Sequence, residues 1–319
     1  MSIEKVPVQS ARPALAEALL QIGTENERVV IVDSETAPAT NVLPFKKKFP
    51  DRFIQTGIAE QCAVSVAYGL QTQGYIPIVP LFAVFLARRA FDQVYIHVGY
   101  PNANVKLIGC YAGLTAASVG ATHQAFNDIA LMRTIPNMTV IEAADAVELQ
   151  QAVRKAVEIE GPVYIRVVRS DLAKYEYRQV PEDYEFQLGK ATVLQEGKDI
   201  TLVGSGIMLS RCREAAEKLA AEGISAEIIN VSTIKPLDDE TIVRSAEKTR
   251  HVVVAENSSV IGGLGSAVAE VLSKKCPTPM EFVGIQDRFG HSGTFEELTV
   301  MYNLTADDVL EKAHAVLKK

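Results

Sequence analysis

One carboxylate stands directly before a long apolar stretch. Glu60 follows Gln55-Thr56-Gly57-Ile58-Ala59 and precedes residues 61–70, most of which are apolar. The pattern predicts a buried helix whose first turn carries the acid. An acid at this place could simply favour the positive end of the helix dipole. Alternatively, burial would penalise its charged form, and the carboxyl group could exchange a proton with a bound ligand.

Five further side chains could build a binding site, but each also has an ordinary structural explanation. Phe82 and Phe85 lie three residues apart and could wall a ring-shaped ligand, although aromatic residues more often fill a core. His123 precedes a helical stretch, where a lone histidine is commonly a structural loop residue. Arg12 and Arg169 could grip a tetrahedral oxyanion, or could be solvated surface charges. These alternatives stay open at the level of single residues.

The composition is that of a globular protein. The chain has 319 residues, 48% hydrophobic and 22% charged, with a net charge of -7. This length accommodates about two domains of ~150 residues each. The longest basic run, Lys46-Lys47-Lys48, is too short for a nucleic-acid surface. Nucleic acid is therefore not expected as a partner.

No pattern indicates a membrane, a disulfide framework or a zinc site. Cys62, Cys110, Cys212 and Cys276 are scattered, and none forms a CxxC pair. Residues 1–5 lack the apolar core of a signal peptide, and no apolar run approaches ~18 residues. We expect a cytoplasmic protein.

Two glycine-rich turns resemble phosphate sites only superficially. Gly204-Ser205-Gly206 lacks the third glycine of a dinucleotide fingerprint, because Leu209 occupies that position. The sequence GGLG at 262–265 is equally typical of a close-packed helix entry. We interpret both as strand-to-helix turns, which disfavours a standalone nucleotide-binding protein.

Apolar strands and helical stretches alternate in two series. In the first we expect strands at 29–32, 76–81, 105–110, 138–141 and 163–168, and helices at 13–22, 62–70, 82–97, 124–134 and 146–157. Asp145 is expected to cap the last of these helices. In the second we expect strands at 200–203, 226–231, 252–255 and 282–285, and helices ending at 221 and spanning 239–248, 265–273 and 305–317.

These series predict an α/β fold with two doubly wound domains. The strands are apolar throughout and helices separate them, which is typical of mostly parallel sheets flanked by helices on both faces. Residues 170–190 are rich in Tyr, Asp, Glu and Pro and suggest a linker. The expected domains are therefore residues 1–180 and 181–319.

Several motifs follow one another in a familiar order. They are GIAEQ at 57–61, FAVF at 82–85, RAFDQ at 89–93, ATHQ at 121–124, IALMRTIPN at 129–137, ADAVE at 144–148, GPVYIR at 161–166, IKPLD at 234–238, GGLGSAVAE at 262–270 and DRFGHSG at 287–293. Their order and spacing resemble the C-terminal half of transketolases, from Arg12 to Leu317. The resemblance implies a pyrimidine-binding domain followed by a transketolase C-terminal domain.

The other half of a transketolase carries a Gly-Asp-Gly motif that holds Mg²⁺ and the tail of thiamine diphosphate. This chain contains no Gly-Asp-Gly. The resemblance therefore implies a split enzyme, in which a partner subunit supplies the diphosphate-binding domain and the metal ligands. A two-plus-two heterotetramer is the assembly that the family suggests. The activity would be transfer of a two-carbon ketol unit between sugars.

The resemblance also implies roles for the candidate residues. Glu60 would hydrogen-bond a ring nitrogen of the cofactor's aminopyrimidine and promote its reactive tautomer. Phe82 and Phe85 match the aromatic residues around that ring. Glu35 falls where the family has an aspartate, and could touch the cofactor's edge or the subunit contact.

On the substrate side, His123 matches a histidine that binds sugar hydroxyls close to the reacting carbons. Arg12 and Arg169 match two arginines that grip the sugar phosphate. Tyr111 stands where the family has a further substrate histidine.

Other positions also depart from the family pattern. Val119 replaces an aspartate that senses a substrate hydroxyl, Ala39 replaces a phosphate-binding serine, and Arg88 replaces a third aromatic residue. Several positions expected to contact the sugar thus carry different residues, while the two arginines remain. We expect an anionic ketose outside the pentose-phosphate sugars, such as a sulfonated deoxyketose or a branched sugar phosphate.

Three other functions remain open from the sequence. The beta subunits of 2-oxoacid dehydrogenases share the architecture, but residues 122–137 and 235–238 resemble transketolase more. Deoxyxylulose-phosphate synthase is related, but is expected to carry its other domain in the same chain. A non-catalytic regulatory or interaction subunit is the alternative from a different class.

Overall fold

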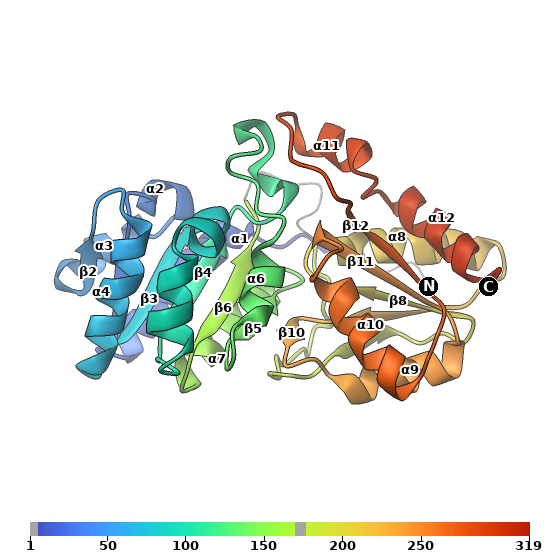
Figure 1. Ribbon diagram of the computed structural model, residues 1–319, viewed down its shortest axis with the longest axis horizontal. Coiled ribbons are helices and arrows are strands. Elements are labelled where there is room, and N and C mark those ends of the chain that lie inside the picture. Colours follow the sequence, from blue (N-terminus) through green and yellow to red (C-terminus); the bar gives the residue numbers. More distant parts are fainter. Residues whose placement is uncertain (1–5, 170–176) are drawn as a thin grey trace.

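The computed structural model describes residues 6–169 and 177–319 (Figure 1). Two α/β halves lie side by side, each built on its own sheet. The signal-peptide prediction concerns residues 1–5, which lie outside the described residues. The same holds for residues 170–176 of the expected linker.

The first sheet has seven strands in the order β10-β5-β6-β4-β3-β1-β2. Every neighbouring pair is parallel except β10 and β5. The strands are β1 (Val29–Asp33), β2 (Phe53–Gln55), β3 (Ile76–Phe82), β4 (Lys106–Cys110), β5 (Thr139–Glu142), β6 (Val163–Val167) and β10 (Thr233–Lys235). All residues of β1, β4 and β6 are buried, which explains why their sequences do not alternate.

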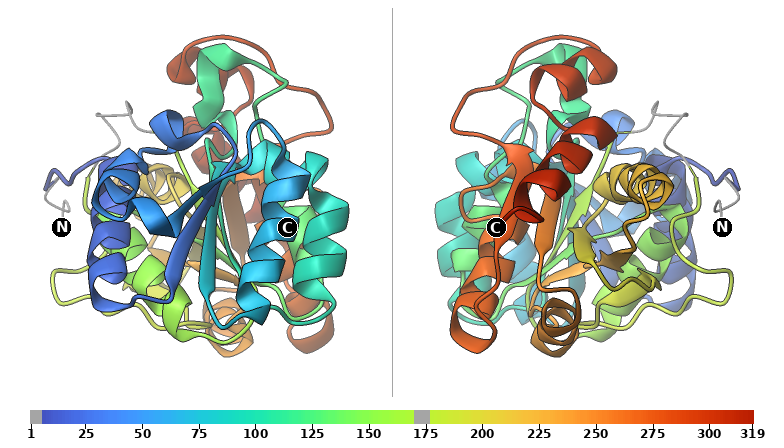
Figure 2. Two further views of the ribbon diagram at one scale, coloured as in Figure 1. Left: turned by 90° about the vertical axis from the view of Figure 1, so that its left-hand side faces the viewer. Right: turned by 90° about the vertical axis from the view of Figure 1, so that its right-hand side faces the viewer.

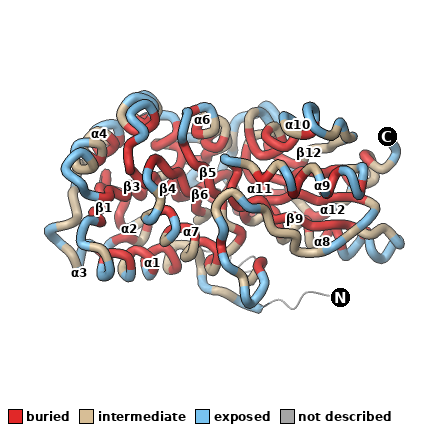
Figure 3. Tube along the Cα trace, turned by 90° about the horizontal axis from the view of Figure 1, so that it is seen from below, coloured by how far each residue is buried: buried red, intermediate tan, exposed pale blue. Residues whose placement is uncertain are grey.

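Helices cover both faces of this sheet. Figure 3 shows α1 and α7 on one side of it, and α4 and α6 on the other. The described helical elements of this half are α1 (Ala11–Glu25), α2 (Ala37–Thr40), α3 (Leu43–Lys48), η1 (Pro50–Arg52), α4 (Glu60–Thr72), η2 (Phe85–Arg89), α5 (Phe91–Gln93), η3 (Val94–Gly99), η4 (Leu114–Val119), α6 (Asp128–Thr134) and α7 (Ala146–Glu158). Asp145 caps α7 as predicted, because its side chain accepts a hydrogen bond from the Glu148 amide.

The second sheet has five strands in the order β12-β11-β8-β9-β7, and only β7 is antiparallel to its neighbour. The elements of this half are β7 (Thr192–Gln195), β8 (Ile200–Gly204), α8 (Met208–Ala221), β9 (Ala226–Asn230), α9 (Asp239–Thr249), β11 (Val252–Ser259), α10 (Leu264–Lys275), β12 (Met280–Ile285), α11 (Phe295–Met301) and α12 (Ala306–Val316). The predicted fold class is confirmed. None of the described helices is long and apolar enough to cross a membrane.

Both glycine-rich turns are strand-to-helix connections, as predicted. Gly204 ends β8 and α8 begins at Met208. At the start of α10, the Glu256 carboxylate accepts hydrogen bonds from the amides of Leu264 and Gly265, each at 2.8 Å. An internal carboxylate therefore satisfies these amides, which a phosphate would otherwise use.

The loop that carries η4 and the segment with α11 project together from one end of the molecule (Figures 1 and 2). Gln124 joins them, because its side-chain amide donates to the His291 carbonyl at 2.9 Å. The second half therefore supports a loop that belongs to the first half.

Strand β10 also ties the halves together. It comes from the second half of the sequence, yet it pairs with β5 at the edge of the first sheet, with Thr233 opposite Ile141. Lys235 then donates from Nζ to the carbonyls of Arg133 and Ile135, at 3.0 and 2.5 Å. The Ile-Lys-Pro-Leu-Asp motif at 234–238 thus begins in the edge strand β10, and its lysine anchors that strand to the first half.

The segment after β3 differs from the prediction. The sequence predicts one helix over 82–97, but Phe82 is the last residue of β3. The chain then winds through two π-helical segments, η2 and η3, with α5 between them. Phe82 thus belongs to a strand and Phe85 begins η2, so their spacing does not report an α-helix face. Helix α6 likewise begins at Asp128 rather than near residue 124.

Candidate cofactor and substrate site

The candidate residues gather at the carboxyl edge of the first sheet. Phe82 ends β3, Tyr111 follows β4 directly, and Arg169 follows β6. Glu60 begins α4, soon after β2 ends at Gln55. Ligands of open α/β sheets bind at this edge, because the loops that follow parallel strands meet there.

The start of α4 is held from the loop after β1. Ser34 donates from Oγ to the Gly57 carbonyl at 2.6 Å and accepts from the Ala59 amide at 2.8 Å. Gly57 has a φ of 71°, a left-handed conformation that glycine adopts without steric cost. Glu60 therefore enters the helix from a fixed backbone, and only 3% of the residue is exposed.

Glu60 is buried as predicted, but its surroundings are not wholly apolar. Arg89 donates from Nη1 to Glu60 Oε1 at 2.7 Å, and 47% of the Arg89 side chain is exposed. The apolar sequence after Glu60 therefore does not describe all of its surroundings, because a cation from η2 also contacts it. Sequence reasoning missed Arg89, because its contact depends on the π-helical winding of η2, which has no clear sequence signature.

Four rings form a connected aromatic wall. Phe82 lies edge-to-face with Phe85 and with Tyr111, at centroid distances of 5.7 and 4.6 Å. His123 contacts both phenylalanines, at 5.8 and 5.2 Å. Phe82 and Phe85 are only partly buried, so they line a surface rather than fill a core. Such rings can stack on a flat ligand.

The ring of Tyr111 contacts both arginines. The guanidinium carbons of Arg12 and Arg169 lie 5.8 and 5.4 Å from its centroid. Arg12 also donates from Nη1 to the Ala39 carbonyl at 2.8 Å and to the Tyr111 hydroxyl at 3.4 Å. The Arg169 amide donates to Thr115 Oγ1 at 3.1 Å. Two cations and a hydroxyl group thus share one corner of the edge, which suits an anionic group.

His123 belongs to the aromatic wall and lies close enough to Arg89 to sense its positive charge. Its Nδ1 is 2.9 Å from Thr122 Oγ1. Burial, and then the charge of Arg89, hold the pKa of His123 below its ordinary value. The shift favours the neutral imidazole, which can donate one hydrogen bond and accept another.

Of the positions that depart from the family pattern, Ala39 and Arg88 contact residues in or next to this site. Val119 ends η4 and is exposed, and Ala39 offers its carbonyl to Arg12. Arg88 is exposed and donates from Nη2 to the Thr122 carbonyl at 3.4 Å. Burial and the neighbouring Arg89 lower the pKa of Arg88.

Glu35 lies in the loop that holds α4, with an exposed side chain and a φ of 58°. Its amide donates to Gln55 Oε1 at 3.1 Å, and the Gln55 side chain also donates to Asp33 at 2.8 Å. Its predicted role at the cofactor's edge or at a subunit contact stays a prediction.

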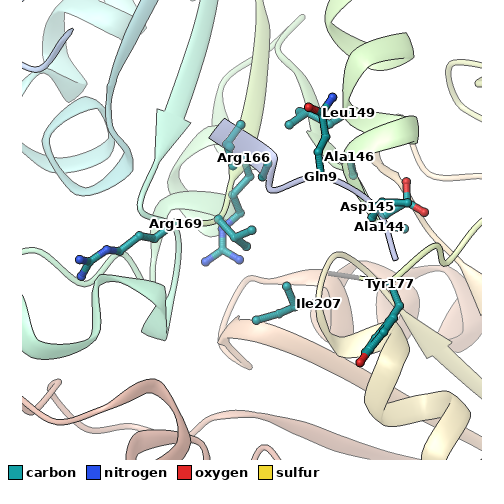
Figure 4. Close-up of a pocket in the computed structure, with 14 residues that line it drawn as sticks. Gln9, Ala144, Asp145, Ala146, Leu149, Arg166, Arg169, Tyr177 and Ile207 are labelled. Carbon is teal, nitrogen blue, oxygen red and sulfur yellow. The ribbon is translucent and has the colours of Figure 1, made fainter. Parts of the chain in front are cut away.

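A small cavity adjoins the arginine corner and shares Arg169 with it (Figure 4). It is lined by Gln9, Asp145, Arg166, Tyr177 and Ile207, among others, and has a volume of about 50 Å³. That volume admits a few water molecules but not a ketose, because one water occupies about 30 Å³ in the liquid. Arg169 also lines this cavity, and Figure 4 shows its side chain extending to the opposite side from Asp145 and Tyr177. The open carboxyl edge is therefore the better candidate for the substrate site.

Two family models match this chain. The model described as transketolase, pyrimidine binding domain, matches residues 8–174, and the model described as transketolase, C-terminal domain, matches residues 189–309. The chain belongs to the transketolase family. The candidate site thus lies mainly in the part that matches the transketolase pyrimidine binding domain.

Individual transketolase relatives match along nearly their whole length. The 6-deoxy-6-sulfo-D-fructose transketolase subunit SqwH from Clostridium sp. (strain MSTE9) is 42% identical, over 97% of this chain and 94% of its own. A subunit of the apulose-4-phosphate transketolase from Phocaeicola vulgatus is 33% identical, and the match covers 97% of this chain and 98% of the relative. A solved split-gene transketolase, described as an inactive β4 tetramer, is 46% identical and has a TM-score of 0.90. The match covers 98% of this chain and 99% of that structure's chain. The prediction of a transketolase subunit is confirmed.

Proposed function

We propose that this chain is the C-terminal subunit of a split, thiamine diphosphate-dependent transketolase that moves a two-carbon ketol unit from an anionic ketose to an aldose. The observation that carries the proposal is the gathering of Glu60, the Phe82–Phe85 wall and the Arg12–Arg169 corner at one sheet edge. A proton-exchanging carboxyl group, a stacking wall and an anion grip are what this chemistry needs from the pyrimidine side.

The residues fit the aminopyrimidine end of the cofactor. Arg89 shows that a planar nitrogen-bearing group can lie over the Phe85 ring and donate to Glu60 at the same time. When bound, thiamine diphosphate supplies the nucleophilic carbon that carries the ketol unit. Glu60 would exchange a proton with the ring nitrogen, the phenylalanines would flank the ring, and neutral His123 would bind sugar hydroxyls.

We assign the diphosphate and Mg²⁺ to a partner subunit with the diphosphate-binding domain. The chain has no Gly-Asp-Gly motif, and residues 6–169 and 177–319 contain no group of three His, Cys, Asp or Glu side chains that could hold a metal ion. The related β4 tetramer is described as inactive, which supports the need for a partner. A two-plus-two assembly, domains at residues 1–180 and 181–319, and a cytoplasmic location belong to the same proposal.

The donor in this proposal is a sulfonated deoxyketose or a branched sugar phosphate. Arg12 and Arg169 supply charge-assisted donors for its anionic end, and the Tyr111 hydroxyl lies in the same corner. Val119 offers no hydrogen bond to a sugar hydroxyl. Two relatives are named for sugars of these kinds, 6-deoxy-6-sulfo-D-fructose and apulose 4-phosphate, which supports this choice.

Reconstitution with the partner tests the function directly. The chain would be purified together with a Gly-Asp-Gly-bearing subunit, which would be sought first in the neighbouring open reading frames. Ketol transfer would then be measured with thiamine diphosphate, Mg²⁺ and a panel of sulfonated, branched and pentose-phosphate donors. We expect transfer that depends on both subunits and on both cofactors.

Two results would contradict parts of the proposal. A higher kcat/KM for xylulose 5-phosphate than for every sulfonated or branched donor would overturn the donor assignment. Unchanged activity in a Glu60→Ala complex would show that Glu60 is structural and that this chain acts as a non-catalytic subunit.

A further inference from the structure

Arg89 occupies the space between the buried carboxylate and the aromatic wall. Its guanidinium carbon lies 4.2 Å from the centroid of the Phe85 ring, within the range of a cation–π contact. From the same position, Nη1 donates to Glu60 Oε1 at 2.7 Å. The guanidinium thus fills the gap between Phe85 and Glu60.

These two contacts resemble those proposed for the cofactor. A guanidinium is flat, carries N–H donors in its plane, and stacks on aromatic rings. An aminopyrimidine that stacks beside Phe85 and hydrogen-bonds Glu60 needs the same space and the same carboxylate oxygen. Both groups cannot occupy that space, so Arg89 must leave before the ring can enter.

The surroundings of Arg89 allow this exchange. Nearly half of its side chain is exposed, so it can turn into solvent without a change in the backbone. Burial lowers the pKa values of Arg88 and His123, and the charge of the nearby Arg89 lowers both of them further. Glu60 is the single anion with which Arg89 forms an ion pair in the described part of the chain. Moving Arg89 outward would relieve the repulsion from the neighbouring Arg88 cation.

We propose that Arg89 is a built-in competitor for the pyrimidine pocket: its guanidinium occupies Glu60 Oε1 and the space beside Phe85 until the cofactor displaces it. The proposal rests on the proposed function, because it assumes that the aminopyrimidine ring binds at Glu60. Arg89 is therefore a positioning residue that acts through Glu60. It lowers the apparent affinity for the cofactor, because only the fraction of molecules with Arg89 displaced can bind.

Calorimetric titration of thiamine diphosphate into the assembled complex tests this competition. The complexes would contain wild-type chain, Arg89→Met or Arg89→Gln, with saturating Mg²⁺. We expect Arg89→Met to lower the apparent Kd by roughly tenfold at low ionic strength. Arg89→Gln keeps a planar N–H donor without charge, so its Kd should lie between the other two.

Ionic strength adds a readout that a merely structural role would not change. Salt screens the charge of Arg89, whose side chain is about half exposed, so the wild-type and Arg89→Met Kd values should converge as salt increases. Arg154→Met is the matched control, because Arg154 pairs with Glu25 at 2.8 Å with both side chains partly exposed, and neither residue belongs to the site. The Kd of thiamine diphosphate for the Arg154→Met complex should equal that for the wild-type complex at every salt concentration.

The possible outcomes separate this inference from the proposed function. Tighter binding by Arg89→Met that converges with the wild type in salt supports the competitor role. Equal or weaker binding by both Arg89 variants overturns it, even if the wild-type complex binds cofactor and transfers ketol units. A wild-type complex that neither binds thiamine diphosphate nor transfers ketol units overturns the proposed function itself.

Discussion

Arg166 and Asp128 form an ion pair closed to solvent, in which Arg166 Nε lies 2.8 Å from Asp128 Oδ2 and both side chains are 0% exposed. Arg166 also donates to Glu142 at 2.6 Å, and to the carbonyls of Ala125 and Asn257 at 3.0 and 2.8 Å. Asn257 belongs to the second half of the chain. One guanidinium therefore joins β6, the start of α6 and β11, directly behind the loops that carry His123 and Arg169.

Breaking this pair should destabilise the fold. Asp128→Asn removes the carboxylate charge that faces Arg166, while it keeps the size of the side chain. Glu142 still pairs with Arg166 in this variant. The expected cost is therefore that of weakened hydrogen bonds to a charged group, about 1.5–3 kcal/mol. Urea unfolding of the purified chain would measure the change in the free energy of unfolding.

The exposed Arg154–Glu25 pair supplies the control for this measurement. Glu25→Gln should cost less than about 1 kcal/mol, since solvent screens an exposed pair. Equal losses of unfolding free energy in Asp128→Asn and Glu25→Gln would show that the buried pair stabilises the fold no more than an exposed pair does.

Glu60→Gln should abolish most of the activity while the protein stays folded. The amide keeps the shape of the side chain but cannot exchange a proton with the cofactor ring. A positioned acid–base group contributes roughly 10²–10⁴-fold to the rate, so kcat of the complex should fall by that factor. Stopped assays of ketol transfer would measure kcat, and thermal unfolding would confirm the fold. A loss smaller than threefold would speak against a proton-transfer role.

Arg169→Met should weaken binding of the donor through its anionic end. A hydrogen bond to a charged group contributes about 1.5–3 kcal/mol, so kcat/KM should fall roughly 10–150-fold, mainly through KM. The matched substrate is a ketose of the same length with a neutral terminal group. Its kcat/KM should be similar in wild type and variant; an equal loss with both substrates would place Arg169 outside the anion contact.

Lys106 provides a pH-dependent prediction at the opposite end of β4. Its Nζ donates to the carbonyls of Ile159 and Gly161, each at 2.7 Å. Burial lowers the pKa of Lys106 from 10.5 to about 7, although the charge of Glu160 opposes the shift. Between these two values the unfolded chain binds more protons than the folded chain. Stability attributable to this group should therefore rise with pH above 7 and be lost as pH falls toward 7.

Comparison with Lys106→Met isolates this contribution. From pH 7 to 8.5 the wild type should gain up to about 1.4 kcal/mol per pH unit relative to the variant, measured by urea unfolding. The comparison cancels the opposite effect of Cys110 and Cys212, whose pKa values burial raises to about 12. Parallel pH profiles of the two proteins would contradict the shifted lysine.

The long elements and the site edge were predictable because their signals are local and strong. The continuous apolar sequences of β1, β4 and β6 indicate strands buried on both faces, and their ends place Tyr111 and Arg169 at one edge. Asp145 also has an unambiguous capping role. Such features need no knowledge of distant parts of the chain.

The remaining features depend on contacts between distant segments. Strand β10 has only three residues and exists because β5 offers it an open edge, which no local pattern records. The short elements β2 and β7 escape a periodicity argument for the same reason. The Arg89–Glu60 contact requires the π-helical path of η2, so its residue spacing cannot be read with an α-helical period.

Strand β10 has a consequence for how this protein can vary. By sequence it belongs to the second half, but by hydrogen bonding it completes the sheet that carries the candidate site. Without it, β5 would become an exposed edge, which favours aggregation. Exchange of the second half between relatives would therefore succeed only when β5 and β10 remain compatible. The two halves are expected to co-evolve as one inherited unit, with correlated substitutions on these strands.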